Sequence, residues 1–389
     1  METPPMTHPE MPAAEIVEAA PSSSGAAPSS SGAADSLWGL PRQPAGCPQC
    51  GRAYLVEAAH LGQACPGCAT GRLEPQPVRL RPEPPELLVP FQQSPSDLRP
   101  IFDRFVKPVW LRPDEFNTHT LLQRLTPVNW PMWLVDGDLS GSWQAEMGYD
   151  YQVKSSQESY AQGGWKSREL IETRIRWEPR LGQLTRHYDN AAVPALNETD
   201  SITARIGATQ ARQAVPYRPA ELGQAAIRIP DQHPENAWPQ AQAALHQAAA
   251  EECRQAAHAQ HLRSYAIHAA YANLHWTQLL QPMYATYYLD DQGRPQIVLV
   301  NGQSGQIGGP RRASQRKGCL WSAIGLGLSA FLLFIYLLLV LAGRSMPGLS
   351  SLAVLTLCMA LGAGVLAIVP AAWPWQWNRS QQPPPQPGI

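Results

Sequence analysis

The sequence predicts a multidomain protein with a small zinc ribbon, an α+β domain with an antiparallel sheet, and a C-terminal two-helix transmembrane hairpin. Two long uncharged apolar runs predict the hairpin, and two closely spaced CxxC pairs predict the ribbon. Apolar residues that alternate with polar ones between about 126 and 200 predict the sheet. The predicted units are a disordered leader (1–45), the zinc ribbon (46–70), a Pro-rich linker (71–86), the cytoplasmic α+β domain (87–310), transmembrane helices (320–342 and 352–373) and a disordered tail (378–389).

The leader and the linker are recognised by their composition. Residues 1–45 consist mostly of Pro, Ser, Ala and Gly, and such a segment has too little apolar surface to offset its ordering entropy. We therefore expect the leader to be disordered. Residues 71–86 contain five prolines, which favour a stiff, extended linker between the ribbon and the larger domain.

The ribbon is predicted from Cys47, Cys50, Cys65 and Cys68, two CxxC pairs that fourteen residues separate. Each pair offers two thiolates from one turn, and structural Zn²⁺ sites take four such ligands in a tetrahedron. We predict one structural Zn²⁺ here, because four cysteines leave no coordination position open for catalysis. Few large apolar residues surround the cysteines, so we expect the metal to supply most of the folding energy and its removal to unfold the ribbon alone.

The α+β domain is predicted from periodicity and turn residues. Apolar residues three or four apart between Leu98 and Val106 indicate a short helix, and the Ala-rich run from Pro239 to about Leu262 indicates a longer one. Turns in the sheet are expected at 136–138, 163–164 and 181–182. A last hairpin is expected around the turn at 290–293.

The two apolar runs, 320–342 and 352–373, are each long enough to cross a hydrocarbon core. Basic residues flank the outer ends of the pair and are nearly absent from the link: Arg311, Arg312, Arg316, Lys317 and Arg379, against Arg344 alone. By the positive-inside rule, this predicts a two-pass protein of the bacterial cytoplasmic membrane with both termini in the cytoplasm. Lipid is thus the first expected partner.

Small residues predict how the two spans pack. Gly325 and Ser329 lie four residues apart in the first span, and Ala360 and Gly364 in the second. Such pairs lie on one helix face and let two backbones approach closely. Tryptophans at the ends of both runs also predict an aromatic belt at one membrane surface (Trp321, Trp373, Trp375, Trp377).

Two further patterns invite a metal interpretation. Asp136 to Gly141 offers oxygens at the first, third and fifth positions of a calcium loop, but Met147 stands where the loop needs an acid, so a tight turn is favoured. His246, His258 and His261 are predicted to lie on the Ala-rich helix without a complete ligand set, which favours a polar surface role.

Charge and motifs limit the function classes. A net charge of −1 argues against a dedicated nucleic-acid binder. No nucleophile, base and acid converge in the sequence, so we expect neither an enzyme nor a small-molecule substrate. The preferred hypothesis is a membrane-anchored scaffold or regulator that binds an unknown protein partner. The alternative is a membrane-associated protein that binds nucleic acid through the ribbon, because residues 41–82 contain five Arg against two Glu.

Several short motifs resemble a bacterial family of zinc-ribbon membrane proteins that are often labelled primosomal protein N-prime or replication-restart-helicase-like. These motifs are Pro90–Phe91, Trp110 with Arg112 and Pro113, Pro131–Asp136, Trp177 with Gly182, His187–Asp189, Pro194–Ala195, and Leu299–Gly305 with Gly309 and Pro310. The resemblance covers about 45–342 and implies the architecture above. A helicase needs a GxxxxGK[ST] phosphate loop, which this sequence lacks, so the similarity to the helicase is confined to the cysteine pairs.

Overall fold

The structure is a computed structural model that describes residues 38–39, 41–77, 81, 83–161, 163–342 and 349–381. Most of the predicted leader and tail, part of the linker and the centre of the link between the two apolar helices lie outside the described residues. The helices are α2 (Arg99–Val106), α3 (Thr118–Gln123), α4 (Thr199–Ile206), α5 (Trp238–Ala256), α6 (Gln315–Ala342), α7 (Leu349–Leu366) and α8 (Val369–Ser380). The strands are β1 (Gln43–Gly46), β2 (Ala53–Val56), β3 (Glu74–Pro75), β4 (Leu87–Leu88), β5 (Thr126–Ala161), β6 (Gly164–Pro194), β7 (Val215–Pro216), β8 (Ala226–Arg228), β9 (His261–Leu289), β10 (Pro295–Asn301) and β11 (Ile307–Gly308).

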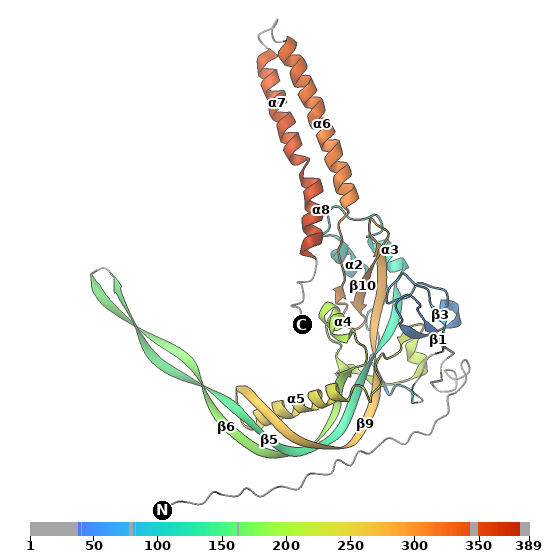
Figure 1. Cartoon of the computed structure of the whole chain (residues 1–389), viewed down its shortest axis with the longest axis vertical. Helices are drawn as coiled ribbons and strands as arrows, with labels where there is room; N and C mark the ends of the chain where they lie inside the picture. The colour runs from blue at the N-terminus through green and yellow to red at the C-terminus, as the bar shows by residue number, and fades with distance from the viewer. Residues whose placement is uncertain are drawn as a thin grey trace, which may run out of the picture.

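Three unusually long strands, β5, β6 and β9, form the backbone of the fold. β5 lies in the middle, antiparallel to β6 on one side and to β9 on the other. Figure 1 shows these strands extending from the globular body as one curved sheet. The predicted antiparallel sheet is therefore present, with strands that continue through two of the expected turns.

Two of the three predicted turns are absent, because strands β5 and β6 continue through these positions. Residues 136–138 form bulges inside β5, where the Asp138 carboxylate accepts hydrogen bonds from His187 Nδ1 (2.7 Å) and Asn273 Nδ2 (2.6 Å) on the flanking strands. Gly182 continues β6 because the ring of Trp143 covers it, so that an added Cβ would lie 3.1 Å from the indole. Cross-strand partners thus outweigh the turn propensity of these residues. The third predicted turn, at 163–164, is the tip of the β5–β6 hairpin.

Helix α5 packs on the concave side of the curved sheet formed by β5, β6 and β9 (Figure 1). Its buried side chains recur every four residues, at Ala241, Leu245, Ala249 and Cys253, and so form one stripe against the strands. The support ends at Tyr149, whose hydroxyl donates to the carbonyl of Ala257 (3.0 Å). Strand β9 begins at the same level with His261, which pairs with Gly148 of β5, so β9 does not accompany β5 any further.

Beyond that level β5 and β6 continue alone. We call this two-stranded part, residues 149–161 and 164–176, the arm. The arm curves away from the body and then toward the side from which the apolar helices project (Figure 1). Most of its side chains are exposed. A two-stranded hairpin without a packed face is only marginally stable in water, so the arm calls for a functional explanation.

The predicted Ala-rich helix ends earlier than expected, at Ala256. His258 has a left-handed backbone conformation (φ 52°) that stops the helix, and His261 already begins β9. Of the three histidines expected on this helix only His246 is there, so the prediction was wrong for His258 and His261.

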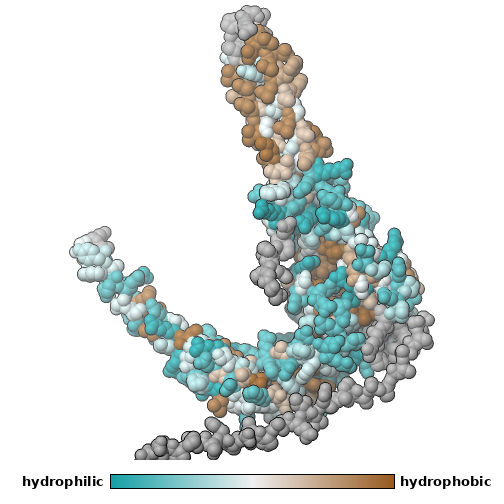
Figure 2. Space-filling model, in the orientation of Figure 1, coloured by the Kyte–Doolittle hydropathy of each residue, from teal (hydrophilic) through white to brown (hydrophobic). Residues whose placement is uncertain are grey.

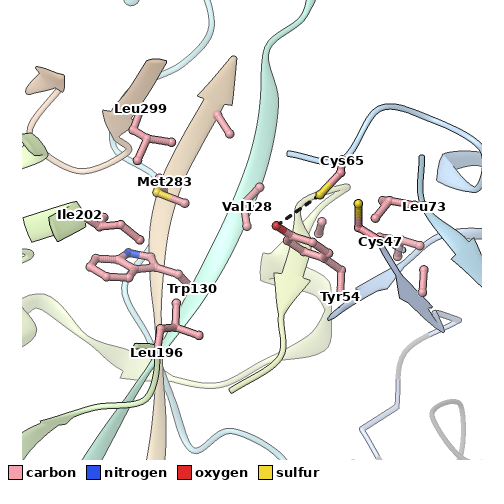
Figure 3. Close-up of a cluster of buried hydrophobic side chains, with 14 of the residues drawn as sticks. Cys47, Tyr54, Cys65, Leu73, Val128, Trp130, Leu196, Ile202, Met283 and Leu299 are labelled. Atoms are coloured by element: carbon pink, nitrogen blue, oxygen red, sulfur yellow. Dashed lines mark hydrogen bonds between the residues drawn. The ribbon is translucent and has the colours of Figure 1, made fainter. Parts of the chain in front are cut away.

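The cysteine-containing segment belongs to the same sheet as the body. Strand β2 pairs with β8, which in turn pairs with β5. Figure 3 shows Tyr54 and Leu73 of this segment in one apolar cluster with Val128 and Trp130 of β5. The expectation of a ribbon that folds alone therefore needs correction, because its apolar residues complete a core that the body shares.

The two apolar helices, α6 and the α7–α8 pair, are long and apolar enough to cross a membrane. They lie side by side as a hairpin that projects from the body, and their surface is apolar where that of the body is polar (Figures 1 and 2). α7 ends at Leu366 and α8 begins at Val369, an interruption followed by Pro370, which has no N–H to donate. Trp373 and Trp377 do not form a free belt, because both pack against the apolar cluster around α2.

The predicted small residues lie at the contact between α6 and α7. The Ser329 hydroxyl donates to the carbonyl of Ala360 (2.7 Å), and a Cβ added to Gly364 would lie 3.1 Å from that hydroxyl. A Cβ added to Gly325 would lie 2.7 Å from the Cβ of Ala367. The close approach that the sequence predicted is present at these positions.

We expect Gly325→Leu to separate the helices and to destabilise the hairpin by about 1–2 kcal/mol, because the new side chain meets Ala367. The matched control is Gly327→Leu, since a Cβ at Gly327 meets nothing within 4 Å. Thermal unfolding of the full chain in detergent measures the effect. Equal melting temperatures for the two variants would contradict this packing.

Candidate metal centre

Two tight turns of similar geometry carry the four cysteines. The first turn begins at Cys47, directly after β1, and contains Cys50 three residues later. The second turn contains Cys65 and Cys68. In the first turn the carbonyl of Cys47 accepts from the N–H of Gly51 (2.9 Å), and in the second the carbonyl of Cys65 accepts from Ala69 (2.8 Å). The donors have left-handed conformations, with φ of 71° and 54°. Each turn therefore presents its two thiols toward the other turn.

The four sulfur atoms converge on one point. All four Sγ atoms lie within 4.8 Å of one another. Cys47 and Cys68 are 3.6 Å apart and Cys50 and Cys65 are 3.7 Å apart, and no disulfide joins them. Four thiolates around a tetrahedral Zn²⁺, each about 2.3 Å from the metal, would be separated by about 3.8 Å. The observed spacing fits this geometry closely.

Without a metal, burial favours the protonated form of two of the thiols. Cys47 and Cys65 are buried, and burial raises the pKa of the Cys65 thiol well above its usual value. Burial also raises the pKa of Cys50. Because a coordinating metal stabilises the thiolate, bound metal would reverse this preference and release the protons.

Backbone donors and a tyrosine surround the sulfurs. The N–H of Gly67 donates to Cys65 Sγ (3.4 Å), and the N–H of Gly71 donates to Cys68 Sγ (3.5 Å). Tyr54 OH lies 4.0 Å from Cys65 Sγ. Figure 3 shows the contact between the two side chains. Burial raises the pKa of Tyr54, so its hydroxyl stays protonated and can donate to a thiolate. Tyr54 was not among the predicted site residues. The sequence gives no signal that singles it out, because Tyr54, Leu55 and Val56 are all apolar and all buried.

A glycine is required where the second turn passes the first. A Cβ added to Gly71 would lie 2.4 Å from Cys47 Sγ. Any side chain there would displace a ligand, which explains the smallest residue at this position.

The second turn contains one strained residue that can be improved. Ala69 has a φ of 54°, a conformation that glycine adopts without strain. We expect Ala69→Gly to raise the free energy of unfolding by between zero and about 1 kcal/mol. Metal binding should be unaffected. Gly51→Ala places the same strain in the first turn and should destabilise by a similar amount, since Gly51 has a φ of 71°. Chemical unfolding of both variants measures the difference, and a destabilising Ala69→Gly would contradict the turn geometry.

The four predicted ligands are brought together, and the other predicted candidates are not. Among the residues that the structure describes, one group of three or more metal-ligating side chains converges, and it consists of these four cysteines. Residues 136–141 lie inside β5, so they form neither a calcium loop nor the favoured tight turn. His261 pairs with Asp150 across the sheet (2.8 Å) and His246 bonds Tyr271, so each has a structural partner.

A metal ion held by all four cysteines would have no open coordination position, so the arrangement suits a structural metal and not a catalytic one. Comparison with protein-family models, curated proteins and solved structures gives no significant match, so the function must be inferred from the geometry.

Proposed function

We propose that this chain is a membrane-anchored cytoplasmic protein with a structural zinc centre, and that it acts as a scaffold or regulator by binding another protein through its arm. The positive charge around the start of α6 and the end of α8 supports a cytoplasmic position for the body and both termini. The resemblance to bacterial zinc-ribbon membrane proteins is consistent with this architecture. Neither a catalytic constellation nor a phosphate loop supports an enzyme.

The observation that carries the proposal is an apolar row on one face of the arm. Residues opposite each other in the register share a face, and alternate residues along a strand do too. By this rule Tyr160, Trp165, Ile171 and Ile175 all lie on one face, which we call the apolar face. All four are exposed, Trp165 to 73%. The ion pair of Lys154 with Glu169 (3.1 Å) lies on the same face.

The opposite face has a different character. It carries Lys166, Arg168, Arg174 and Arg176, with Leu170 and Tyr151 as exposed large apolar residues among them. A protein surface seldom exposes a row of large apolar side chains unless a partner covers it. Aromatic anchors such as Trp165 and Tyr160, which contact each other edge to face at 5.5 Å, are typical of protein interfaces.

The alternative, nucleic-acid binding through the ribbon, has less support. Each arginine of residues 41–82 that the structure describes already has an internal partner. Arg42 donates to the carbonyls of Ala225 and Gly223, Arg52 pairs with Glu198, Arg72 donates to Gly62, and Arg81 pairs with Glu83. Few cationic groups are left to contact phosphates.

A position-specific crosslinking experiment tests the proposal. A photoreactive amino acid at Trp165 would lie on the apolar face, and the same group at Lys166 would lie on the opposite face at the same distance from the body. In native membranes we expect a discrete protein adduct from position 165 and a much weaker one from position 166. The substitution Ile171→Asp should abolish the adduct, whereas Leu170→Asp should preserve it.

Three outcomes would contradict arm binding: equal labelling from both positions, labelling of lipid alone, or an adduct unaffected by Ile171→Asp. Steep, salt-dependent binding of DNA by the purified full chain would favour the alternative instead. Reporter fusions at the N-terminus, in the link between α6 and α7, and after Ile389 test the orientation. A reporter signal from outside the cytoplasm at either terminus would overturn it.

A further inference from the structure

A polar pocket lies where the body meets the membrane hairpin. It has a volume of about 560 Å³ and is lined by the β9–β10 turn, the segment before α6, and the end of α8. Its charged and aromatic lining includes Asp290, Asp291, Arg294, Arg312, Trp375 and Arg379. Chain segments far apart in sequence thus converge at the base of the hairpin (Figure 1).

Hydrogen bonds hold the two sides of this pocket together. The side chain of Asn378 donates to the carbonyl of Ala313 (2.9 Å) and accepts from its N–H (2.8 Å). Trp377 Nε1 donates to the carbonyl of Arg311 (2.7 Å). The end of α8 is therefore fastened to the segment before α6, and the pocket is a built feature rather than a gap between two loosely placed helices.

The acidic residues of the pocket are occupied by neighbouring donors. The Asp290 carboxylate accepts from the N–H groups of Gln292 and Arg294, from Arg294 Nε (3.2 Å) and from Gln296 Nε2 (3.1 Å). Its charge is offset by Arg294 in the same turn. Asp291 accepts from the backbone N–H of Arg316 (3.0 Å) in the first turn of α6, where a helix favours negative charge.

Two arginines of the pocket have no carboxylate partner in the described part of the chain. One guanidinium nitrogen of Arg312 donates weakly to the carbonyl of Asn378 (3.4 Å). The guanidinium of Arg379 lies over the ring of Trp375, 5.4 Å from its centre, and the ring itself is exposed. The pocket therefore offers two cationic forks for planar or tetrahedral anions.

We propose that this pocket binds the phosphate of an anionic phospholipid headgroup. The inference rests on the membrane anchoring proposed above, which would place the base of α6 and the end of α8 at the level of the headgroups. Exposed Trp375 suits that level, since tryptophan favours the membrane–water interface. Basic pockets beside cytoplasmic helix ends are typical sites for such lipids. A free inorganic phosphate shares the chemistry, so the test must separate the two sources.

The test uses the delipidated full chain in detergent and native mass spectrometry. Phosphatidylglycerol and phosphatidylcholine with identical acyl chains are titrated in parallel. We expect the wild type to prefer phosphatidylglycerol by about tenfold and Arg312→Gln/Arg379→Gln to lose this preference. The matched control, Arg168→Gln/Arg212→Gln, removes two exposed arginines elsewhere and should keep it. Arg312→Lys/Arg379→Lys should keep part of it, which guards against misfolding of the glutamine variant.

The outcomes separate this site from the proposed function. Equal affinity for the two lipids, or an equal loss in the control, would overturn the lipid site. Displacement of phosphatidylglycerol by millimolar inorganic phosphate would show a soluble-anion site and also overturn it. Extraction of the wild type by alkaline carbonate would refute membrane anchoring itself, whereas loss of the crosslinked partner concerns only the arm.

Discussion

Replacing Cys47 and Cys65 together by serine should release the bound metal and loosen strands well outside the cysteine turns. The metal in such a site contributes on the order of 10 kcal/mol to folding of the segment that holds it. Here Tyr54 and Leu73 of that segment share an apolar cluster with Val128 and Trp130 of the body, and β2 pairs with β8. Loss of the turns would therefore expose one side of the central sheet.

Elemental analysis and hydrogen exchange measure the two effects. We expect about one zinc per wild-type chain, none in the double variant, and faster exchange of the β8 amides, Ala226–Arg228. Cys253→Ser is the control, since this thiol belongs to α5, packs against Ala145 and Met147 of β5, and takes no part in the centre. Zinc retained in the double variant would refute the ligand set. Faster exchange confined to residues 46–70 would instead show a ribbon that unfolds alone.

Gly141→Val should be among the most destabilising single substitutions in the sheet. A Cβ at Gly141 would lie 2.1 Å from the carbonyl oxygen of His268 and 2.8 Å from the Cα of Ala269, both backbone atoms of β9. Backbone cannot move aside as a flexible side chain can, so β5 and β9 must separate locally. We expect a loss on the order of 3 kcal/mol or more.

The hairpin tip supplies the control for this substitution. Gly164→Val places the same side chain in β6 where a Cβ meets nothing within 4 Å. We expect this variant to unfold within about 0.5 kcal/mol of the wild type. Denaturant unfolding monitored by tryptophan fluorescence compares the two. Similar stability of both variants would show that β5 and β9 are not paired as described at this point.

The parts of the fold that depend on local pattern could be predicted from the sequence. The apolar runs and the small residues within them identified the hairpin and its contact, because a run without charges has few alternatives. The CxxC pairs identified the four cysteines that converge, because each turn fixes its own two thiols. The helix around Phe102 was likewise recognised from its periodicity.

The remaining features depend on partners distant in the sequence. Asp138 and Gly182 have the composition of turns, yet they continue strands because His187, Asn273 and Trp143 on neighbouring strands meet them. The end of α5 was placed too late because alanine-rich composition gives no signal for the left-handed residue at His258. The pairing of β2 with β8 joins segments without any local signal, so the Pro-rich linker suggested a separation that the packing does not have.

The register of the long strands also fixes the order in which they are able to form. β5 and β6 meet at a short turn, so their pairing can close from Tyr160 and Trp165 inward with little loss of chain entropy. β9 must instead find β5 across the whole intervening chain, since Thr126 pairs with Ala285. Long-range antiparallel pairing of this kind folds slowly. The β5–β6 hairpin, once made, can therefore serve as a preformed template on which β9 docks late, after α5 has been synthesised.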